Sequence, residues 1–146
     1  MPIHFQTSVR IARPLDTVFA FVADPLQLPR WNSAVQSTTS TSPRPGSVGS
    51  TYAMQRDLPT GRARNDLEVF ELDPPAAFGI RTTSGPTPFV YRYRFTADDH
   101  ATIVELDARV DLSGPATLVA ALATPAVKRG VDANLGTLKE LQERAA

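Results

Sequence analysis

The sequence predicts an α+β fold: a seven-stranded antiparallel sheet, two short helices after the first strand, and a long C-terminal helix. Runs that alternate between apolar and polar residues are separated by turn signals, and short helical patterns follow the first run. An apolar stripe at helical spacing closes the chain. Because strands and helices are segregated along the sequence, the order favours α+β over a parallel, doubly wound arrangement.

The first strand is predicted over residues 3–11, where apolar and polar residues alternate as in a half-buried strand. Pro14 stops this strand and suits the first turn of a helix, and apolar residues recur at helical spacing over 15–22. Asp24 ends that helix because a residue before proline avoids the helical region. A second helical turn over 25–30 then leads to Trp31.

Six further strands are predicted between residues 34 and 112, where proline, glycine and aspartate mark the turns. The runs are 34–41, 48–57, 62–72, 78–83, 89–96 and 101–112. In the last two, one face is apolar and the other charged, as expected for a sheet with one solvated face. The threonine-rich stretch 38–41 suits an exposed edge strand, which would be open to pairing with a second copy as a homodimer.

The last helix is predicted to open at Gly114 and Pro115, and to kink or restart at Pro125. Its apolar stripe consists of Val127, Val131, Leu135, Leu138 and Leu141. Asn134 lies on this stripe, where a buried amide needs hydrogen-bond partners. It would either orient a ligand oxygen or bond a neighbouring strand or a water.

The composition limits the function classes. A chain of 146 residues, 42% hydrophobic and 21% charged, fits one domain over 1–146 with enough apolar material for a core. Fifteen basic residues balance fifteen acidic ones, which disfavours nucleic acid as a partner. Short apolar runs disfavour stable membrane insertion, and an N-terminus without signal-peptide features predicts a cytoplasmic location.

Neither a metal centre nor a cofactor is expected. The chain has no cysteine, and His4 and His100 lack partners at metal-ligand spacing and fit no catalytic triad. Both histidines are expected at the surface, and no catalytic residue is assigned. Strand parity places three polar side chains on the inner face of the sheet: Arg56, Asn65 and Glu71.

Six short segments carry a resemblance to a known superfamily. They read IARPLDTVF at 11–19, ADP at 23–25, PRWN at 29–32, GSVG at 46–49, EVFELDPP at 68–75 and NLGTLKEL at 134–141. In this order they resemble the SRPBCC superfamily, the START-like, polyketide cyclase/dehydrase and lipid transport group. The resemblance spans essentially the whole chain and implies the helix-grip fold, in which a curved sheet wraps around the C-terminal helix and leaves an elongated cavity.

In such a fold, bulky residues are shared between the core and the cavity wall. Tyr91, Tyr93 and Phe95 point the same way along one strand, and Tyr52 and Met54 do so along another. Each suits either an apolar pocket or a plain core, and the same holds for Trp31. The residues expected to contact a ligand are Trp31, Tyr52, Met54, Leu67, Val69, Phe78, Tyr91, Tyr93, Phe95, Leu122, Val131 and Asn134.

Three functions remain open from the sequence. The first is a binding protein that holds a small apolar molecule, such as a lipid, polyketide or aromatic metabolite, by desolvation. The alternative is a cyclase, dehydratase or hydrolase that acts on such a ligand in the same pocket. There, tyrosine hydroxyls, alone or with Asn65 or Arg56, would polarise a carbonyl oxygen. The third is a structural or interaction protein whose cavity is filled by its own side chains.

Overall fold

The computed structural model describes residues 2–58, 61–112 and 117–145, with only the backbone described at 2, 58 and 117–123. The strands are β1 (Pro2–Ile11), β2 (Val35–Ser40), β3 (Thr51–Leu58), β4 (Gly61–Asp73), β5 (Ala77–Ser84), β6 (Phe89–Asp98) and β7 (Ala101–Asp111). The helices are α1 (Leu15–Val22), the 3-10 turn η1 (Pro25–Gln27), α2 (Leu28–Trp31) and α3 (Thr117–Arg144). This order of elements confirms the predicted α+β fold.

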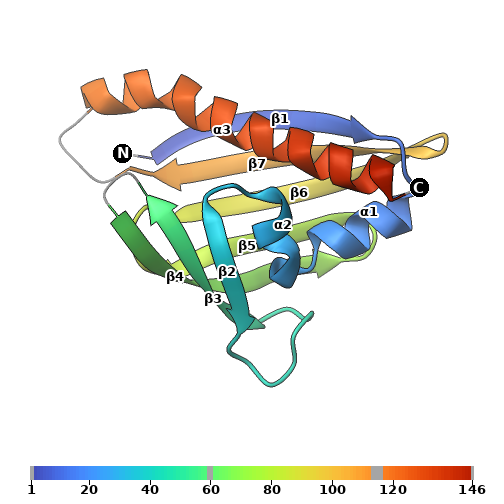
Figure 1. Cartoon of the computed structure of the whole chain (residues 1–146), viewed down its shortest axis with the longest axis horizontal. Coiled ribbons are helices and arrows are strands. Elements are labelled where there is room, and N and C mark those ends of the chain that lie inside the picture. The colour runs from blue at the N-terminus through green and yellow to red at the C-terminus, as the bar shows by residue number, and fades with distance from the viewer. Residues whose placement is uncertain (1, 59–60, 113–116, 146) are drawn as a thin grey trace.

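The strands form one antiparallel sheet in the order β1-β7-β6-β5-β4-β3-β2. The first strand lies beside the last, and every other neighbour in the sheet is also a neighbour along the chain. Figure 1 shows α3 lying in front of the sheet alongside β1, with α1 and α2 below it. The strands β2 to β4 are turned relative to β1 and β7, so the sheet curves around the helices (Figure 1).

The two faces of the sheet differ in chemistry because only the inner face is covered by helices. On β6, Tyr93 and Phe95 are buried on the inner face, whereas Arg92 and Arg94 are exposed on the outer face. The same alternation continues on β7, where buried apolar residues are separated by exposed or half-buried charged ones. Burial of one apolar face against helices is the main stabilising contribution to such a sheet.

A β-bulge in β4 reverses the predicted direction of Glu71. The register pairs Val69 with Ile80 and Glu71 with Gly79, so Phe70 is an extra residue without a partner in the ladder. Beyond the bulge the parity changes, and Glu71 lies on the outer face, where its Oε2 accepts a hydrogen bond from Arg94 Nη1 at 3.3 Å. The prediction that Glu71 faces inward is therefore wrong.

Two predicted boundaries also change. β3 begins at Thr51 rather than at residue 48, because the preceding segment turns tightly and Ser50 N donates to Ser47 O at 3.0 Å. The helix α3 continues through Pro125 without a restart. Pro125 is exposed, so water can satisfy the carbonyl that loses its N–H partner. The predicted opening at Gly114 and Pro115 lies outside the described residues.

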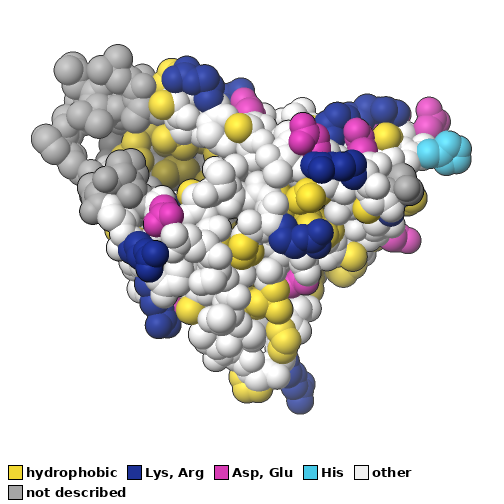
Figure 2. Space-filling view, in the orientation of Figure 1, with side chains coloured by type: hydrophobic (Ala, Val, Ile, Leu, Met, Phe, Trp, Pro, Cys, Tyr) yellow, Lys and Arg dark blue, Asp and Glu magenta, His cyan; other side chains and the backbone are white. Residues whose placement is uncertain are grey.

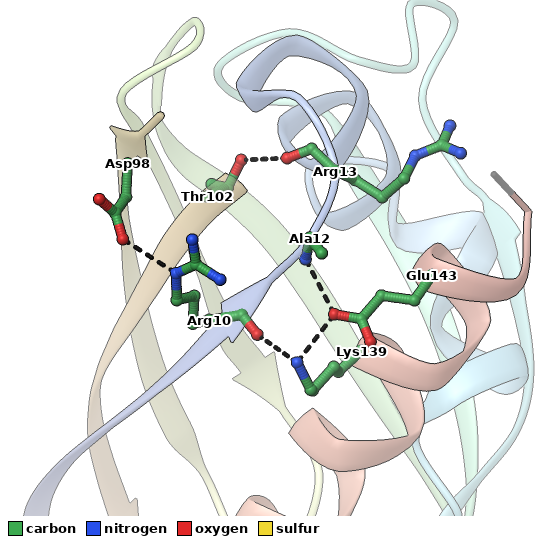
Figure 3. Close-up of polar contacts among 7 residues, drawn as sticks. All are labelled: Arg10, Ala12, Arg13, Asp98, Thr102, Lys139 and Glu143. Carbon is green, nitrogen blue, oxygen red and sulfur yellow. Dashed lines mark hydrogen bonds and ion pairs between the residues drawn. The ribbon is translucent and has the colours of Figure 1, made fainter. Parts of the chain in front are cut away.

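The C-terminal end of α3 is joined to the end of β1 by hydrogen bonds to the backbone (Figure 3). Lys139 Nζ donates to the carbonyl of Arg10 at 2.7 Å and to Glu143 Oε2 at 2.8 Å. The same Oε2 accepts a hydrogen bond from the backbone N–H of Ala12 at 2.8 Å. These contacts hold α3 against the inner face of the sheet and so define one wall of the space between them.

Candidate functional site

A cavity of about 220 Å³ lies between α3, the segment around α2 and the inner face of β3, β5 and β6. Its wall is mostly apolar, with polar contributions that include Arg56, Tyr91 and Asn134. Figure 2 shows a hollow beneath α3 with hydrophobic side chains on its floor. Because a dry cavity of about 150 Å³ binds benzene, this cavity can hold a molecule of one or two rings.

The cavity brings together several of the side chains expected to contact a ligand. Those that line it are Trp31, Met54, Phe78, Tyr91, Tyr93, Val131 and Asn134. They come from α2, β3, β5, β6 and α3, and most of them from positions that strand parity or helical spacing placed on the inner face. Their contact with a ligand stays a prediction.

Other expected residues are buried elsewhere in the core. Leu67 and Val69 are fully buried, and Phe95 packs edge-to-face on Phe19 with ring centroids 5.0 Å apart. The hydroxyl of Tyr52 accepts a hydrogen bond from the backbone N–H of Gly46 at 3.1 Å. None of these four expected residues lines the cavity. The side chain of Leu122 lies outside the described residues.

The sequence did not single out the part of the cavity wall formed by the segment after α2. Asn32, Ser33, Ala34 and Val35 all border the cavity, although this short connection shows no periodic pattern. Other lining residues that were not expected are Val22, Pro25, Leu28, Ile80, Phe89, Val127 and Gly130. Val127 lies on the predicted apolar stripe of α3, so helical spacing could have indicated it.

Arg56 and Asn65 form a polar cluster on the inner face, as strand parity predicted. Arg56 Nη1 donates to Asn65 Oδ1 at 3.1 Å and to the carbonyl of Thr87 at 3.4 Å. Asn65 is fully buried, and its Nδ2 donates to the carbonyls of Ser84 at 3.1 Å and Pro86 at 2.9 Å. The amide thus holds the turn between β5 and β6, while the guanidinium also reaches the cavity wall.

The tyrosines of the cavity are neutral over the physiological pH range. Burial raises the pKa of Tyr91 to about 12, and the nearby Arg56 cation opposes part of this rise. Burial also raises the pKa of Tyr93, and the neighbouring Tyr91 adds to the effect. In the opposite sense, burial lowers the pKa of Arg56. Arginine nevertheless stays protonated at neutral pH, so Arg56 contributes a positive charge beside two neutral phenols.

Asn134 connects α3 to the segment that follows α2. Its Oδ1 accepts hydrogen bonds from Ser33 N at 3.2 Å and from Ser33 Oγ at 3.3 Å. Of the two roles that the sequence left open, the structure shows a bond to a neighbouring segment of the protein. The amide nitrogen has no partner among the described residues, so it remains free to meet a ligand oxygen.

The indole of Trp31 lines the cavity with only 4% of the residue exposed. Its Nε1 is buried without a hydrogen-bond partner among the described residues. The two histidines lie away from the cavity: His4 Nε2 is 2.9 Å from Asp107 Oδ1 on the outer face, and His100 is exposed in the turn between β6 and β7. Within the described ranges, no three acidic or histidine side chains cluster as metal ligands would.

Comparisons with known proteins agree with this architecture. The family model described as polyketide cyclase / dehydrase and lipid transport matches residues 2–143. A START superfamily protein from Mycobacterium smegmatis is 14% identical, with a TM-score of 0.80 over 98% of this chain and 99% of its own. A protein from Thermus thermophilus is 17% identical, with a TM-score of 0.83 over 99% of each chain.

The Zhui aromatase/cyclase from Streptomyces sp. R1128 is 18% identical, with a TM-score of 0.79 over 99% of this chain and 95% of its own. No curated protein sequence matches the chain significantly. The curved sheet and the closing helix give this chain a helix-grip fold, similar to that of these solved structures. The chain belongs to the polyketide cyclase / dehydrase and lipid transport family. In the described part of the chain, no helix has the length and hydrophobicity needed to cross a bilayer.

Proposed function

We propose that this protein binds a small, mostly apolar molecule of one or two rings in the cavity between the sheet and α3. The cavity of about 220 Å³, walled by aromatic and aliphatic side chains, is the observation that supports this function. Burial of apolar ligand surface contributes about 25 cal/mol per Å². A ligand of about 12 non-hydrogen atoms at about 0.5 kcal/mol per atom would bind with a dissociation constant of about tens of micromolar.

The family match and the structural relatives support ligand binding only through the shared fold, in which a cavity can lie between the curved sheet and the long helix. Ligand pockets of such proteins are expected to be largely preformed and to combine an apolar wall with a few polar groups. Tyr91, Asn134 and Arg56 are the polar groups that would orient a ligand here. The proposal does not depend on a metal or an organic cofactor.

The proposal is tested by titrating the protein with 2-acetylnaphthalene, a neutral two-ring probe, and following the binding by calorimetry. Saturable binding with one site per chain is expected. Val131→Phe places a larger side chain in the cavity and should weaken binding at least about tenfold, as steric overlap in a close-packed site does. Val48→Phe, a matched change at an exposed loop position, should leave binding unchanged. Equal affinity in all three proteins would contradict the proposal.

A second function, cyclisation, dehydration or hydrolysis in the same cavity, is favoured by one arrangement. Tyr91 and Tyr93 are adjacent on the inner face, with ring centroids 6.4 Å apart and protonated hydroxyls, beside the Arg56 charge. Such a group of donors can stabilise an oxyanion that develops on a carbonyl. A variant with Tyr91→Phe and Tyr93→Phe should bind the probe normally in either case. Only the enzymatic function predicts that the wild type, and not this variant, cyclises or dehydrates a poly-β-carbonyl compound.

A further inference from the structure

Arg56 places a positive charge on the wall of a mostly apolar cavity. Its two protein partners, Asn65 Oδ1 and the carbonyl of Thr87, are both neutral, and both are reached by Nη1. Nε and Nη2 have no hydrogen-bond partner among the described residues. The guanidinium also lies over the ring of Phe89, 5.9 Å from its centroid. Three N–H bonds of the guanidinium, one on Nε and two on Nη2, are therefore left for a ligand.

The arginines on the outer face of the sheet differ from Arg56 in having acidic partners. There Arg64, Arg81 and Arg94 each pair with a carboxylate, at 2.9, 2.7 and 3.3 Å respectively. No aspartate or glutamate is among the described side chains that line the cavity. Arg56 is half-buried, and holding a cation partly out of water without a counter-charge costs free energy. A carboxylate with matching geometry offsets that cost. A ligand with a negative charge can supply the counter-charge that Arg56 lacks within the cavity wall.

The other polar groups of the wall add hydrogen bonds without adding negative charge. The hydroxyl of Tyr91 is protonated at neutral pH and lies close enough to Arg56 to feel its charge. The amide nitrogen of Asn134 is also a donor. The cavity is thus rich in donors that converge from β3, β6 and α3, which suits an acceptor oxygen.

We infer that the ligand carries a negatively charged oxygen, a carboxylate or a phenolate, which Arg56 binds while the rings occupy the apolar part of the cavity. This inference rests on the proposed function, because it names the chemical class of molecule that the cavity accepts. The guanidinium matches a carboxylate through two parallel N–H bonds. Tyr91 donates a further hydrogen bond to the same oxygen group.

The test compares two probes of nearly equal shape, 2-naphthoate and 2-acetylnaphthalene, at neutral pH. The wild type should bind 2-naphthoate about 10- to 100-fold more tightly, which is the usual effect of a hydrogen-bonded charge pair. Arg56→Met should abolish this preference, because losing the guanidinium weakens binding of 2-naphthoate much more than binding of the neutral 2-acetylnaphthalene. Arg56→Lys keeps the charge and should retain part of the preference.

Arg109→Met is the matched control, because Arg109 is exposed on the outer face of β7 and its loss changes the net charge equally. It should leave the preference unchanged. If the wild type binds 2-acetylnaphthalene at least as tightly as 2-naphthoate, the inference is wrong while the proposed function stands. If neither probe binds, the proposed function fails and this inference fails with it. If Arg56→Met does not fold, the ratio of the wild-type affinities for 2-naphthoate and 2-acetylnaphthalene still tests the inference.

Discussion

The ring of Phe70 lies over Gly79, so close that a Cβ atom on the glycine would come within 2.7 Å of Phe70 Cζ. Phe70 is the extra residue of the β4 bulge, and on the outer face its ring contacts the guanidinium groups of Arg81 and Arg92. Its centroid is 5.4 and 5.2 Å from their Cζ atoms. The absence of a side chain at position 79 is what allows an aromatic ring to cover this face of the sheet.

Gly79→Ala should therefore destabilise the protein by about 1–3 kcal/mol, because the new methyl group overlaps a ring that cannot move freely. The free energy of unfolding in urea measures the effect. Phe70→Leu in the same chain should recover part of the loss, since the overlapping ring atoms are then gone.

Gly136→Ala is the matched control, because a Cβ atom there meets nothing within 4 Å and the residue lies in a helix. This substitution should stabilise the protein by about 0.5–1 kcal/mol. Equal effects of the two alanines would show that the ring does not constrain Gly79.

Asn65→Leu should destabilise the fold by about 2–4 kcal/mol, since it leaves the carbonyls of Ser84 and Pro86 without their donor inside the protein. Asn134→Leu, which removes two contacts with Ser33 from a partly exposed site, should cost about 1 kcal/mol. Urea unfolding measures both. A cost for Asn65 no larger than that for Asn134 would argue against its role in holding the turn between β5 and β6.

Hydrogen bonds from Lys139 and from the backbone N–H of Ala12 hold the pKa of Glu143 below its usual range. A lowered folded-state pKa means that this carboxylate stabilises the protein above its unfolded pKa, about 4.3, and that the contribution is lost as pH falls through the folded value. Glu143→Gln should therefore lower the melting temperature at neutral pH, and the difference from wild type should close in acid. Glu140→Gln, one turn earlier in an exposed pair with Arg144, should show little change at any pH.

Alkaline stability should depend on Tyr91. Because burial raises its folded-state pKa to about 12, its protonated form favours folding below the unfolded value of about 10, and this contribution is lost as pH rises from about 10 to 12. Tyr91→Phe should make the decline in unfolding free energy over this range shallower. Superimposable profiles for the two proteins would contradict the burial of the hydroxyl.

Strand alternation predicted most of the fold. On β6 the period of two placed Tyr91, Tyr93 and Phe95 on the inner face, which is where they lie. Parity fixes a face of the sheet but not a position along it, so it could not separate Tyr91 and Tyr93 at the cavity from Phe95, which packs on Phe19.

Glu71 and the segment after α2 show where local patterns fail. One extra residue in β4 reverses the direction of Glu71. The apolar residues change there from odd positions, Leu67 and Val69, to the even position of Leu72, a break in alternation that the prediction for Glu71 did not use. Asn32 and Ser33 reach the cavity wall because the chain folds back against α3, and Ser33 bonds a residue 101 positions further along. Such a contact depends on the whole fold rather than on neighbouring residues.

The join between β1 and α3 involves the carbonyl of Arg10 and the N–H of Ala12, not their side chains. Substitutions at position 10 or 12 should therefore leave these hydrogen bonds intact, with one exception. Proline at position 12 has no N–H to donate, so Ala12→Pro would remove the hydrogen bond to Glu143 and leave only the one from Lys139 to the carbonyl of Arg10, although proline is common in loops of this kind. Because the contacts in β1 are made by backbone groups, related chains can keep this attachment without a recognisable sequence motif in β1.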